Sequence, residues 1–240
     1  MVNYTEPELD VLAIGAHPDD VELGCGALLA KLSGQGKKVG ILDLTRGELG
    51  SRGDANQRDR EAARAAKILG ICWRSNVGLP DGGLENTPEF QRVLIPYIRQ
   101  TRPKCIVTLM APDRHPDHSA VHELARNANF LAGLTKIETG QDAHRARQLY
   151  FFYPYLEHET MPSVVVDVTE GFAQKLESLR AYESQFYNPD YEGPTTYIAS
   201  KGFWTGIEAR AAYWGARIGK TYGEGFYVDG PMPLDNLPIP

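Results

Sequence analysis

The sequence predicts an α/β fold: a mostly parallel sheet with helices on both of its faces, followed by a C-terminal elaboration. Over roughly the first 130 residues, strand-like apolar runs alternate with helix-like segments, which is the pattern of parallel strands joined by helical crossovers. The chain has 240 residues, of which 42% are hydrophobic and 23% charged, so it can bury one large core. After about residue 135 the alternation stops. We therefore expect one domain over residues 1–240, with the α/β core at 9–135 and the elaboration, ending in a proline-rich tail, at 136–240.

The core is expected to contain three buried strands and four helices. Continuous apolar runs predict strands at 9–16, 38–44 and 105–110. Apolar residues at helical spacing predict helices at 21–34, 57–69, 88–100 and 119–131. Gly70 directly follows the second helix and Pro88 begins the third, which are positions that these residue types favour. Residues 72–83 are rich in turn-forming residues, so no regular element is expected there.

The second part of the chain carries weaker signals. We expect strands at 148–155 and 163–168, and helices at 170–185 and 196–218. Three glycines weaken the last of these helices. The segment 230–240 carries four prolines and is expected to be extended or loosely docked.

Composition and charge exclude several classes of partner. The net charge of −6 argues against nucleic acid or an anionic membrane as the main partner. No apolar run approaches the roughly 20 residues of a membrane helix, and the polar, acidic start of the chain does not resemble a signal peptide. The three cysteines, which form no CxxC pair, are expected to be reduced and mostly buried. We therefore expect a cytoplasmic protein that binds neither nucleic acid nor a membrane.

Two short polar motifs follow two of the buried strands. The first is His17-Pro18-Asp19-Asp20-Val21-Glu22, and the second is Arg114-His115-Pro116-Asp117-His118. Because the carboxyl ends of parallel strands meet at one edge of an open sheet, both motifs are expected to contribute to one site.

The residue types in these motifs are those of a metal centre. His17 and Asp20 are three residues apart, so both side chains can face the same side, while Asp19 projects differently and is free to act rather than ligate. Two histidines and one carboxylate can hold a catalytic zinc ion and leave one position open. We predict that His17, Asp20 and His118 are the metal ligands, with His115 alongside.

Other interpretations of these residues are weaker. Asp19 or Asp20 could simply cap the following helix, and His122, four residues after His118, could replace it as a ligand. We expect a mainly structural role for His122 because it lies a full turn into the helix. Three further alternatives have little support: a dinucleotide loop at 24–26, which lacks its third glycine, a serine nucleophile at Ser51 or Ser119 without a GxSxG elbow, and ligands at His144 or His158, which have no partners nearby in the sequence.

The two motifs resemble the signatures of the LmbE-like, or PIG-L, zinc-dependent N-acetylglucosamine deacetylases, and the resemblance covers residues 10–229. It implies a Rossmann-like sheet of the LmbE-like fold. Four further segments are similar to those of the deacetylases of bacillithiol biosynthesis, which remove acetate from N-acetylglucosaminyl malate. These segments are 45–53, 79–81, 181–186 and 222–226.

The resemblance implies a role for each residue of the two motifs. One Zn²⁺ ion per chain, or another divalent metal, is held by His17, Asp20 and His118. Asp19 is the general base, which accepts a proton from a water whose pKa the metal has lowered to near 7. His115 assists as an acid or as a charge stabiliser, with Asp117 as a candidate to steer it. The products are acetate and a free glucosamine amine.

The resemblance also implies which residues contact the substrate. They are expected to be Arg46, Glu48, Arg58, Asp81 and Tyr197. Asp81 would contact sugar hydroxyls and Tyr197 would help to hold the oxyanion. Arginine binds carboxylates through its planar fork, so Arg46, Arg52 or Arg58 could meet a malate group, and we expect Arg58 to do so.

The leading hypothesis is therefore a zinc-dependent deacetylase of N-acetylglucosaminyl malate, and the resemblance implies a homo-oligomer. Free N-acetylglucosamine, short chitin oligomers and other amino-sugar conjugates are the alternative substrates. A sugar- or metal-binding protein without turnover is the alternative class. Asp19 and His115 argue against it, because a binding protein needs neither.

Overall fold

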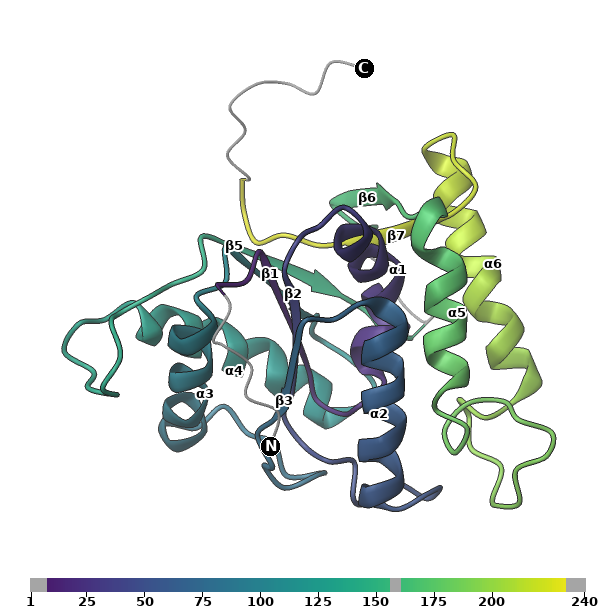
Figure 1. Ribbon diagram of the computed structural model, residues 1–240, viewed down its shortest axis with the longest axis horizontal. Helices are drawn as coiled ribbons and strands as arrows, with labels where there is room; N and C mark the ends of the chain where they lie inside the picture. Colours follow the sequence, from purple (N-terminus) through teal and green to yellow (C-terminus); the bar gives the residue numbers. More distant parts are fainter. Residues whose placement is uncertain (1–7, 156–160, 232–240) are drawn as a thin grey trace.

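The computed structural model describes residues 8–155 and 161–231. Five parallel strands form the central sheet in the order β3-β2-β1-β4-β5 (Figure 1). They are β1 (Val11–Gly15), β2 (Val39–Asp43), β3 (Trp73–Asn76), β4 (Cys105–Leu109) and β5 (Gln148–Phe152). The three inner strands consist almost entirely of buried residues, as expected for a parallel sheet that is covered on both faces. The predicted fold class is confirmed.

Helices cover both faces of this sheet. On one face α3 (Pro88–Thr101) and α4 (Pro116–Ala132) pack against each other, at the left of Figure 1. On the other face α1 (Asp20–Gly34) and α2 (Ala55–Leu69) pack together, and α5 (Phe172–Arg180) lies against both. Helices α2, α3, α4 and α6 (Lys201–Arg217) each begin with a side-chain cap, whereas α1 and α5 do not. The Asp54 side chain, for example, accepts a hydrogen bond of 2.7 Å from Gln57 N at the start of α2.

The C-terminal elaboration adds a second, antiparallel sheet of two strands, β6 (Val164–Asp167) and β7 (Gly223–Phe226). Helix α6 (Lys201–Arg217) packs against this small sheet. A β-bridge between Phe151 and Tyr227 joins the small sheet to the edge of the large one. Core and elaboration therefore share a continuous packing surface.

A buried glutamate ties the elaboration to the first helix of the core. Cys25 has non-helical backbone angles and interrupts α1, so the next turn needs hydrogen-bond acceptors from elsewhere. Glu224 of β7 supplies them, accepting from Ala27 N at 3.2 Å and from Leu28 N at 2.8 Å. Lys175 of α5 neutralises this carboxylate across 2.6 Å, and both side chains are buried.

Several of the predicted elements need correction. The helix predicted at 196–218 begins only at Lys201, and the strand predicted at 148–155 ends at Phe152. The segment 72–83, expected to be irregular, contains β3, and β7 was not predicted. The helix predicted at 119–131 begins at Pro116, and the helix predicted at 170–185 ends at Arg180. Strand β3 has four residues, lies at the sheet edge and is only half-buried after Trp73, so it lacks the apolar run of a core strand. Strand β7 carries two glycines among its four residues, which hides it from a propensity argument.

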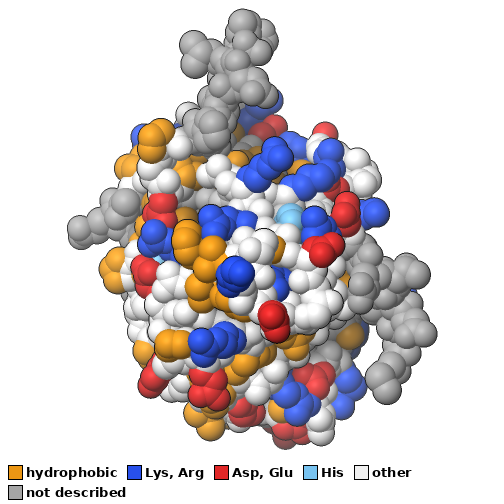
Figure 2. All heavy atoms as spheres, turned by 90° about the vertical axis from the view of Figure 1, so that its left-hand side faces the viewer, with side chains coloured by type: hydrophobic (Ala, Val, Ile, Leu, Met, Phe, Trp, Pro, Cys, Tyr) orange, Lys and Arg blue, Asp and Glu red, His pale blue; other side chains and the backbone are white. Residues whose placement is uncertain are grey.

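Positive charge gathers on one outer face despite the negative net charge. Figure 2 shows the side of the molecule that carries α3 and α4, with Lys and Arg side chains concentrated in its upper part. A hollow at the amino ends of β4 and β5 is lined by several of them, including Arg102, Lys104 and Arg147. His144 also lines this hollow, where its Nε2 lies 2.8 Å from Pro103 O, far in the fold from the two motifs.

Two of the sequence predictions concern segments that cannot be compared with the structure. His158 and residues 232–240 of the proline-rich tail lie outside the described residues. Within the described part of the chain, none of the helices has the length and apolar character to cross a membrane.

Candidate active site

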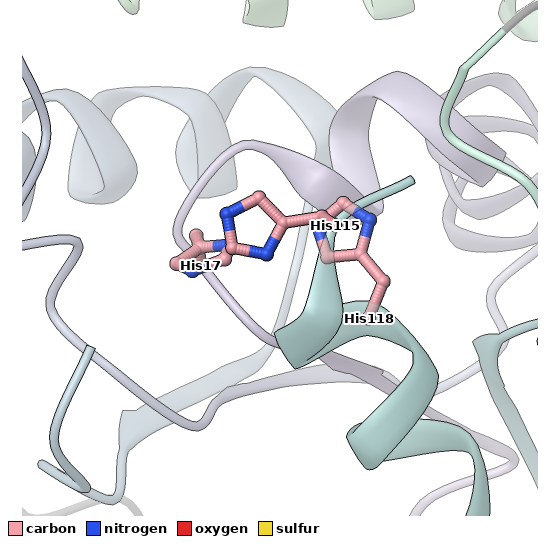
Figure 3. A group of neighbouring side chains, drawn as sticks. All are labelled: His17, His115 and His118. Carbon is pink, nitrogen blue, oxygen red and sulfur yellow. The ribbon is translucent and has the colours of Figure 1, made fainter. Parts of the chain in front are cut away.

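The strand order brings the two sequence motifs together. Strand β1 pairs with β2 on one side and β4 on the other, so the connections that leave it diverge and open a crevice at the carboxyl ends of β1 and β4. The first motif follows β1, and the second follows β4 and begins α4. His17, His115 and His118 meet in this crevice, where one ligand atom from each lies within 4.8 Å of the others (Figure 3).

The Asp20 carboxylate lies between two of these histidines. Its Oδ2 is 3.3 Å from His17 Nδ1, and its Oδ1 is 3.1 Å from His118 Nε2. The backbone N–H of His17 also donates to Asp20 Oδ2 at 2.8 Å, which fixes the turn between them. The predicted convergence of these three side chains is therefore present in the fold.

In both His17 and His118, the ring nitrogen that does not face Asp20 lies close to another carboxylate. His17 Nε2 lies 3.0 Å from Asp81 Oδ1 and 3.3 Å from Asp117 Oδ2. His118 Nδ1 lies 3.1 Å from Asp113 Oδ1. Carboxylates in these positions orient metal-binding histidines and raise their basicity.

These residues fit a divalent metal ion. His118 Nε2 is buried and makes no hydrogen bond of acceptable geometry with the described residues, so it is an unsatisfied donor or ligand atom aimed at Asp20. Burial lowers the pKa of His118, but the charges of Asp20 and Asp113 outweigh it and raise the pKa to about 9. Asp117, Asp20 and Asp81 raise the pKa of His17 well above its usual value in the same way, against burial. The site thus has a strong negative potential, and two nitrogens and one carboxylate are a suitable ligand set for zinc.

Asp19 lies beside this group and makes no cap. Its backbone φ of 119° falls in the left-handed region, an uncommon and strained conformation for a residue with a side chain. Its carboxylate accepts no backbone hydrogen bond at the helix start; instead it receives one of 3.0 Å from Arg58 Nη2. Burial raises the pKa of Asp19 to about 7, although the Arg58 charge opposes this. A carboxylate with such a pKa is suited to proton transfer near neutral pH.

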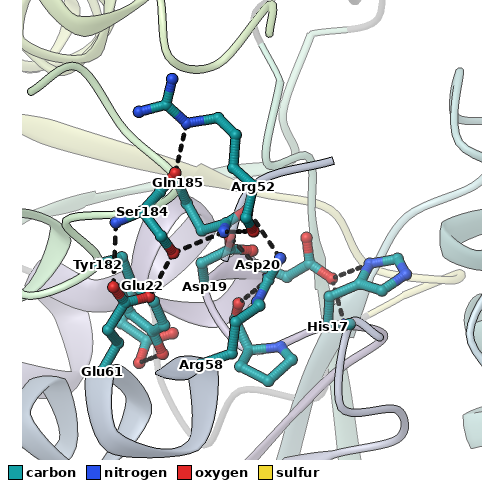
Figure 4. Close-up of polar contacts among 12 residues, drawn as sticks. His17, Asp19, Asp20, Glu22, Arg52, Arg58, Glu61, Tyr182, Ser184 and Gln185 are labelled. Carbon is teal, nitrogen blue, oxygen red and sulfur yellow. Dashed lines mark hydrogen bonds and ion pairs between the residues drawn. The ribbon is translucent and has the colours of Figure 1, made fainter. Parts of the chain in front are cut away.

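Arg58 is itself held by a chain of buried polar contacts, drawn in Figure 4. Its Nη1 donates to Gln185 Oε1 at 2.8 Å, and its Nη2 also donates to the carbonyl of Pro18. Gln185 Nε2 donates to Ser184 Oγ at 2.7 Å, and that hydroxyl donates to Glu61 Oε2 at 2.7 Å. Segment 181–186, singled out in the sequence, therefore fixes the position of Arg58 against Asp19.

His115 caps helix α4 with its side chain. Its Nδ1 accepts a hydrogen bond of 3.3 Å from Asp117 N, which assigns the ring proton of neutral His115 to Nε2. Burial, followed by the positive charges of His17 and His118, lowers the pKa of His115, so the ring is neutral at neutral pH. The expectation that the Asp117 carboxylate steers His115 is wrong. That carboxylate accepts from Gly82 N and Leu84 N and contacts His17, because α4 begins at Pro116 and turns Asp117 away.

A cavity of about 220 Å³ opens over these groups. Residues of both motifs form its floor, and its walls come from other parts of the chain. The lining residues include Gly47, Leu49, Gly50, Arg58, Asp81, Gly82, Tyr155, Gln185 and Ile198. Gly47 has a φ of 66°, and a Cβ there would lie 2.8 Å from Arg58 Cζ, so only glycine leaves room for that guanidinium.

Comparison with known proteins identifies the family. The family model described as PIG-L: GlcNAc-PI de-N-acetylase matches residues 12–129. The chain is also 30% identical over 237 residues to the diacetylchitobiose deacetylase of Thermococcus kodakarensis, covering 92% of this chain and 83% of that one. The chain belongs to the PIG-L, or LmbE-like, deacetylase family.

Two further relatives support this membership. A solved structure, the conserved protein TT1542 from Thermus thermophilus, is 38% identical with a TM-score of 0.85, over 96% of this chain and 98% of that chain. A 1D-myo-inositol 2-acetamido-2-deoxy-alpha-D-glucopyranoside deacetylase of Corynebacterium glutamicum is 28% identical, over 75% of this chain and 76% of that one. As a member of this family the protein is a hydrolase of acetamide bonds, and the resemblance stated from the two motifs is confirmed.

Of the residues expected to contact substrate, some line the cavity and others do not. Arg58 and Asp81 line the cavity, although Asp81 Oδ1 faces His17 and its Oδ2 accepts from Leu49 N at 2.8 Å. Arg46, Glu48 and Tyr197 are not among the lining residues. The exposed Arg46 pairs with Asp59 and Asn56, and Glu48 accepts from the backbone of Asp81 and Arg46.

Tyr155 is a lining residue that sequence reasoning missed. Its ring stacks on that of His118, with centroids 5.5 Å apart and an interplanar angle of 16°. It ends the aromatic run after β5, and nothing in that run distinguished it from core residues. His122, the alternative ligand, lies elsewhere: its Nδ1 is 3.1 Å from Leu109 O and its ring packs on Phe151.

Glu22, the last residue of the first motif, is buried and binds other side chains of the protein interior. It accepts from Arg74 Nη1 at 2.6 Å and from the hydroxyl of Tyr182 at 2.8 Å. Arg74 also binds both oxygens of Asp43. Glu22 therefore stabilises the first turn of α1 through Arg74 and Tyr182, and it does not line the cavity.

Proposed function

We propose that this protein is a zinc-dependent N-deacetylase that acts on a conjugate of N-acetylglucosamine, with N-acetylglucosaminyl malate as the preferred substrate. The relatives named above act on diacetylchitobiose and on an inositol-linked 2-acetamido-2-deoxyglucopyranoside, both of which carry an acetamido sugar. One observation carries the proposal: Asp19, with its pKa raised to about 7, lies next to the His17, Asp20 and His118 group without belonging to it.

We assign the metal to His17, Asp20 and His118. When bound there, a zinc ion supplies Lewis-acid chemistry, by polarising the acetyl carbonyl and by making water more acidic. The carboxylates of Asp81, Asp117 and Asp113 hold the two histidines in orientation.

Asp19 then acts as the general base. Its carboxylate accepts the proton of the attacking water, while the hydrogen bond from Arg58 Nη2 keeps the carboxylate aimed into the cavity. Once protonated, Asp19 can return this proton to the departing amine, which must leave as a neutral group.

His115 stabilises developing charge. Because its Nδ1 accepts from the backbone of Asp117, its Nε2–H is free to donate to the acetyl oxygen as negative charge builds up there. A neutral ring suits this role better than that of a strong acid, since its pKa is lowered by burial.

Malate as the aglycone is supported by the segments that resemble bacillithiol deacetylases. Ser184 and Gln185 of one segment hold Arg58, and Glu48 of another holds the backbone of Asp81. We further propose that the protein works in the cytoplasm as a homo-oligomer. Exposed aromatic side chains such as Phe130 and Tyr213, with 54% and 52% exposed surface, are the kind that subunit contacts bury.

Acetate release by the zinc-loaded protein tests the proposal. N-acetylglucosaminyl malate, N-acetylglucosamine and diacetylchitobiose are offered side by side, with the Asp19→Ala variant as the control. We expect release to be fastest from the malate conjugate, and a rate about 10²- to 10⁴-fold lower in the variant, which is the usual contribution of a general base. Zinc content should be unchanged in Asp19→Ala. Faster release from the plain sugar would refute the malate assignment, and full activity of the variant would refute the mechanism.

A further inference from the structure

Arg114 is a cation beside the cavity, and it directly precedes His115 of the second motif. Its side chain is exposed, and it makes no hydrogen bond or ion pair with any residue in the described ranges. The other arginines near the site already bind groups of the protein. Arg58 binds Asp19, Arg46 binds Asp59, and Arg52 donates to the carbonyls of Ser184 and Pro194.

Two tyrosine rings hold Arg114 in place. Its Cζ lies 4.9 Å from the centroid of Tyr155 and 4.5 Å from that of Tyr197. Tyr155 in turn lines the cavity and stacks on His118. Cation–π contacts use the faces of the rings and leave all the N–H groups of the guanidinium available. The fork of Arg114 is therefore oriented and still able to donate two parallel hydrogen bonds.

The charge of the cavity decides what such a fork would bind. Three carboxylates, those of Asp19, Asp20 and Asp81, line the cavity and face its cationic groups Arg58 and His17, so these lining residues leave no unpaired cation for an anionic group of a substrate. Arg58, the arginine that the sequence led us to expect for this role, already directs both of its terminal nitrogens to Asp19, Pro18 and Gln185, and only its buried Nε lacks a partner among the described residues. An anionic group of the substrate therefore has to bind a cation that lies outside the cavity.

We propose that Arg114, held between Tyr155 and Tyr197, forms the subsite for a carboxylate-bearing aglycone, while the acetamido sugar occupies the cavity. This inference rests on the proposed function and adds the residue that selects an anionic conjugate over a neutral one. In this proposal Tyr197, expected from the resemblance to stabilise the oxyanion, serves to orient the cation.

The test compares an anionic and a neutral substrate. We would measure kcat and KM for N-acetylglucosaminyl malate and for methyl N-acetylglucosaminide with wild-type protein and with Arg114→Gln, Arg114→Lys and Arg126→Gln. Arg126 lies on α4, the helix that begins just after Arg114, is exposed and pairs with Glu123 and Asp229, so its replacement removes an equal charge away from the site.

We expect Arg114→Gln to raise KM for the malate conjugate by about 10- to 100-fold, the range for a charge-assisted hydrogen bond, with kcat nearly unchanged. The neutral glycoside should change by less than about 2-fold, and Arg114→Lys should recover part of the loss. Equal losses on both substrates would overturn the proposal, because they would indicate a general role in holding Tyr155. No loss on either would overturn it as well.

Binding measurements separate this inference from the proposed function. Calorimetric titration with the malate conjugate should show weaker binding to Arg114→Gln than to wild type, whether or not acetate is released. Acetate release by the wild type with equal affinities would refute the Arg114 subsite alone. Weaker binding by the variant without any acetate release would refute the deacetylase activity and keep the subsite.

Discussion

Arg58 Nη2 lies 3.0 Å from Asp19 Oδ2, and this ion pair is buried on both sides. The two residues are 39 positions apart in the chain. Burial raises the pKa of Asp19 by disfavouring its charge, and the guanidinium limits that rise. The pair therefore sets the pH at which the carboxylate becomes able to accept a proton.

Replacing Arg58 should move the pH dependence of catalysis. A base works only when deprotonated, so kcat/KM falls as the pH drops through the pKa of Asp19. Arg58→Gln removes the charge that lowers this pKa, so the acid limb of the profile should shift upward by about one to three pH units. We would measure kcat/KM against pH at saturating zinc, with Arg58→Lys as the charge-preserving control. An acid limb that stays in place in Arg58→Gln would contradict the role of the ion pair.

The carboxylate behind His118 should control metal affinity. Asp113→Asn removes the charge that orients this ring, and zinc affinity should fall by about 10- to 100-fold. Because metal binding requires a neutral ring and the pKa of metal-free His118 is raised to about 9, affinity in the wild type should also fall as the pH drops below about 9. Competition with a chelator over a pH range measures both effects. The exposed Asp142 provides the control variant, Asp142→Asn. Equal losses of zinc affinity in the two variants would contradict the role assigned to Asp113.

The buried pair of Lys175 and Glu224 should be strongly coupled. Burial lowers the pKa of Lys175, yet it remains the cation that faces the Glu224 carboxylate. Lys175→Met leaves that carboxylate unpaired and should cost about 3–5 kcal/mol in the free energy of unfolding. The double variant Lys175→Met/Glu224→Gln should recover a large part of this loss, because no unpaired charge remains. Urea unfolding of the two single variants and the double variant checks the prediction, and simple additivity of the two single changes would refute it.

Gly24 should not tolerate any side chain. A Cβ at this position would lie 1.9 Å from Cδ2 of Phe152, whose ring is fully buried in the core. Gly24→Ala should therefore lower the free energy of unfolding by at least about 1–3 kcal/mol through overpacking. Gly34→Ala is the matched control at the end of the same helix, since nothing lies within 4 Å of its Cβ. We expect thermal unfolding to show a loss for the first and none for the second, and equal midpoints would contradict the packing argument.

Most strands of the sheet, and the residues that form the floor of the site, could be predicted from the sequence. Buried strands appear in the sequence as apolar runs, and the motifs that follow β1 and β4 meet because parallel strands end at the same edge. For this reason the meeting of His17, Asp20 and His118 could be predicted without coordinates. The short strands β3 and β7 could not, since an edge position and two glycines remove the apolar pattern.

Contacts between distant segments were beyond sequence reasoning. Asp117 is two residues from His115, yet its carboxylate contacts His17, because the direction of a side chain depends on where the helix begins. Arg58 was expected to bind substrate, and its hydrogen bonds to Asp19, Pro18 and Gln185 could not be read from the sequence. The alignment of Tyr155 with His118 likewise depends on loop geometry that periodicity does not encode.

The contact between Gln185 and Arg58 has a consequence for anyone who wishes to redesign this enzyme. The reactive groups come from residues 17–20 and 115–118, whereas much of the surrounding wall comes from other loops, an arrangement that invites loop exchange between relatives. Such grafts would bring new selectivity only if the donor loop also carried the Ser184–Gln185 pair, because this pair holds Arg58 and thereby Asp19, the proposed base. A library that randomises residues 186–198 and keeps this dipeptide should therefore yield far more active clones than one that replaces the whole loop.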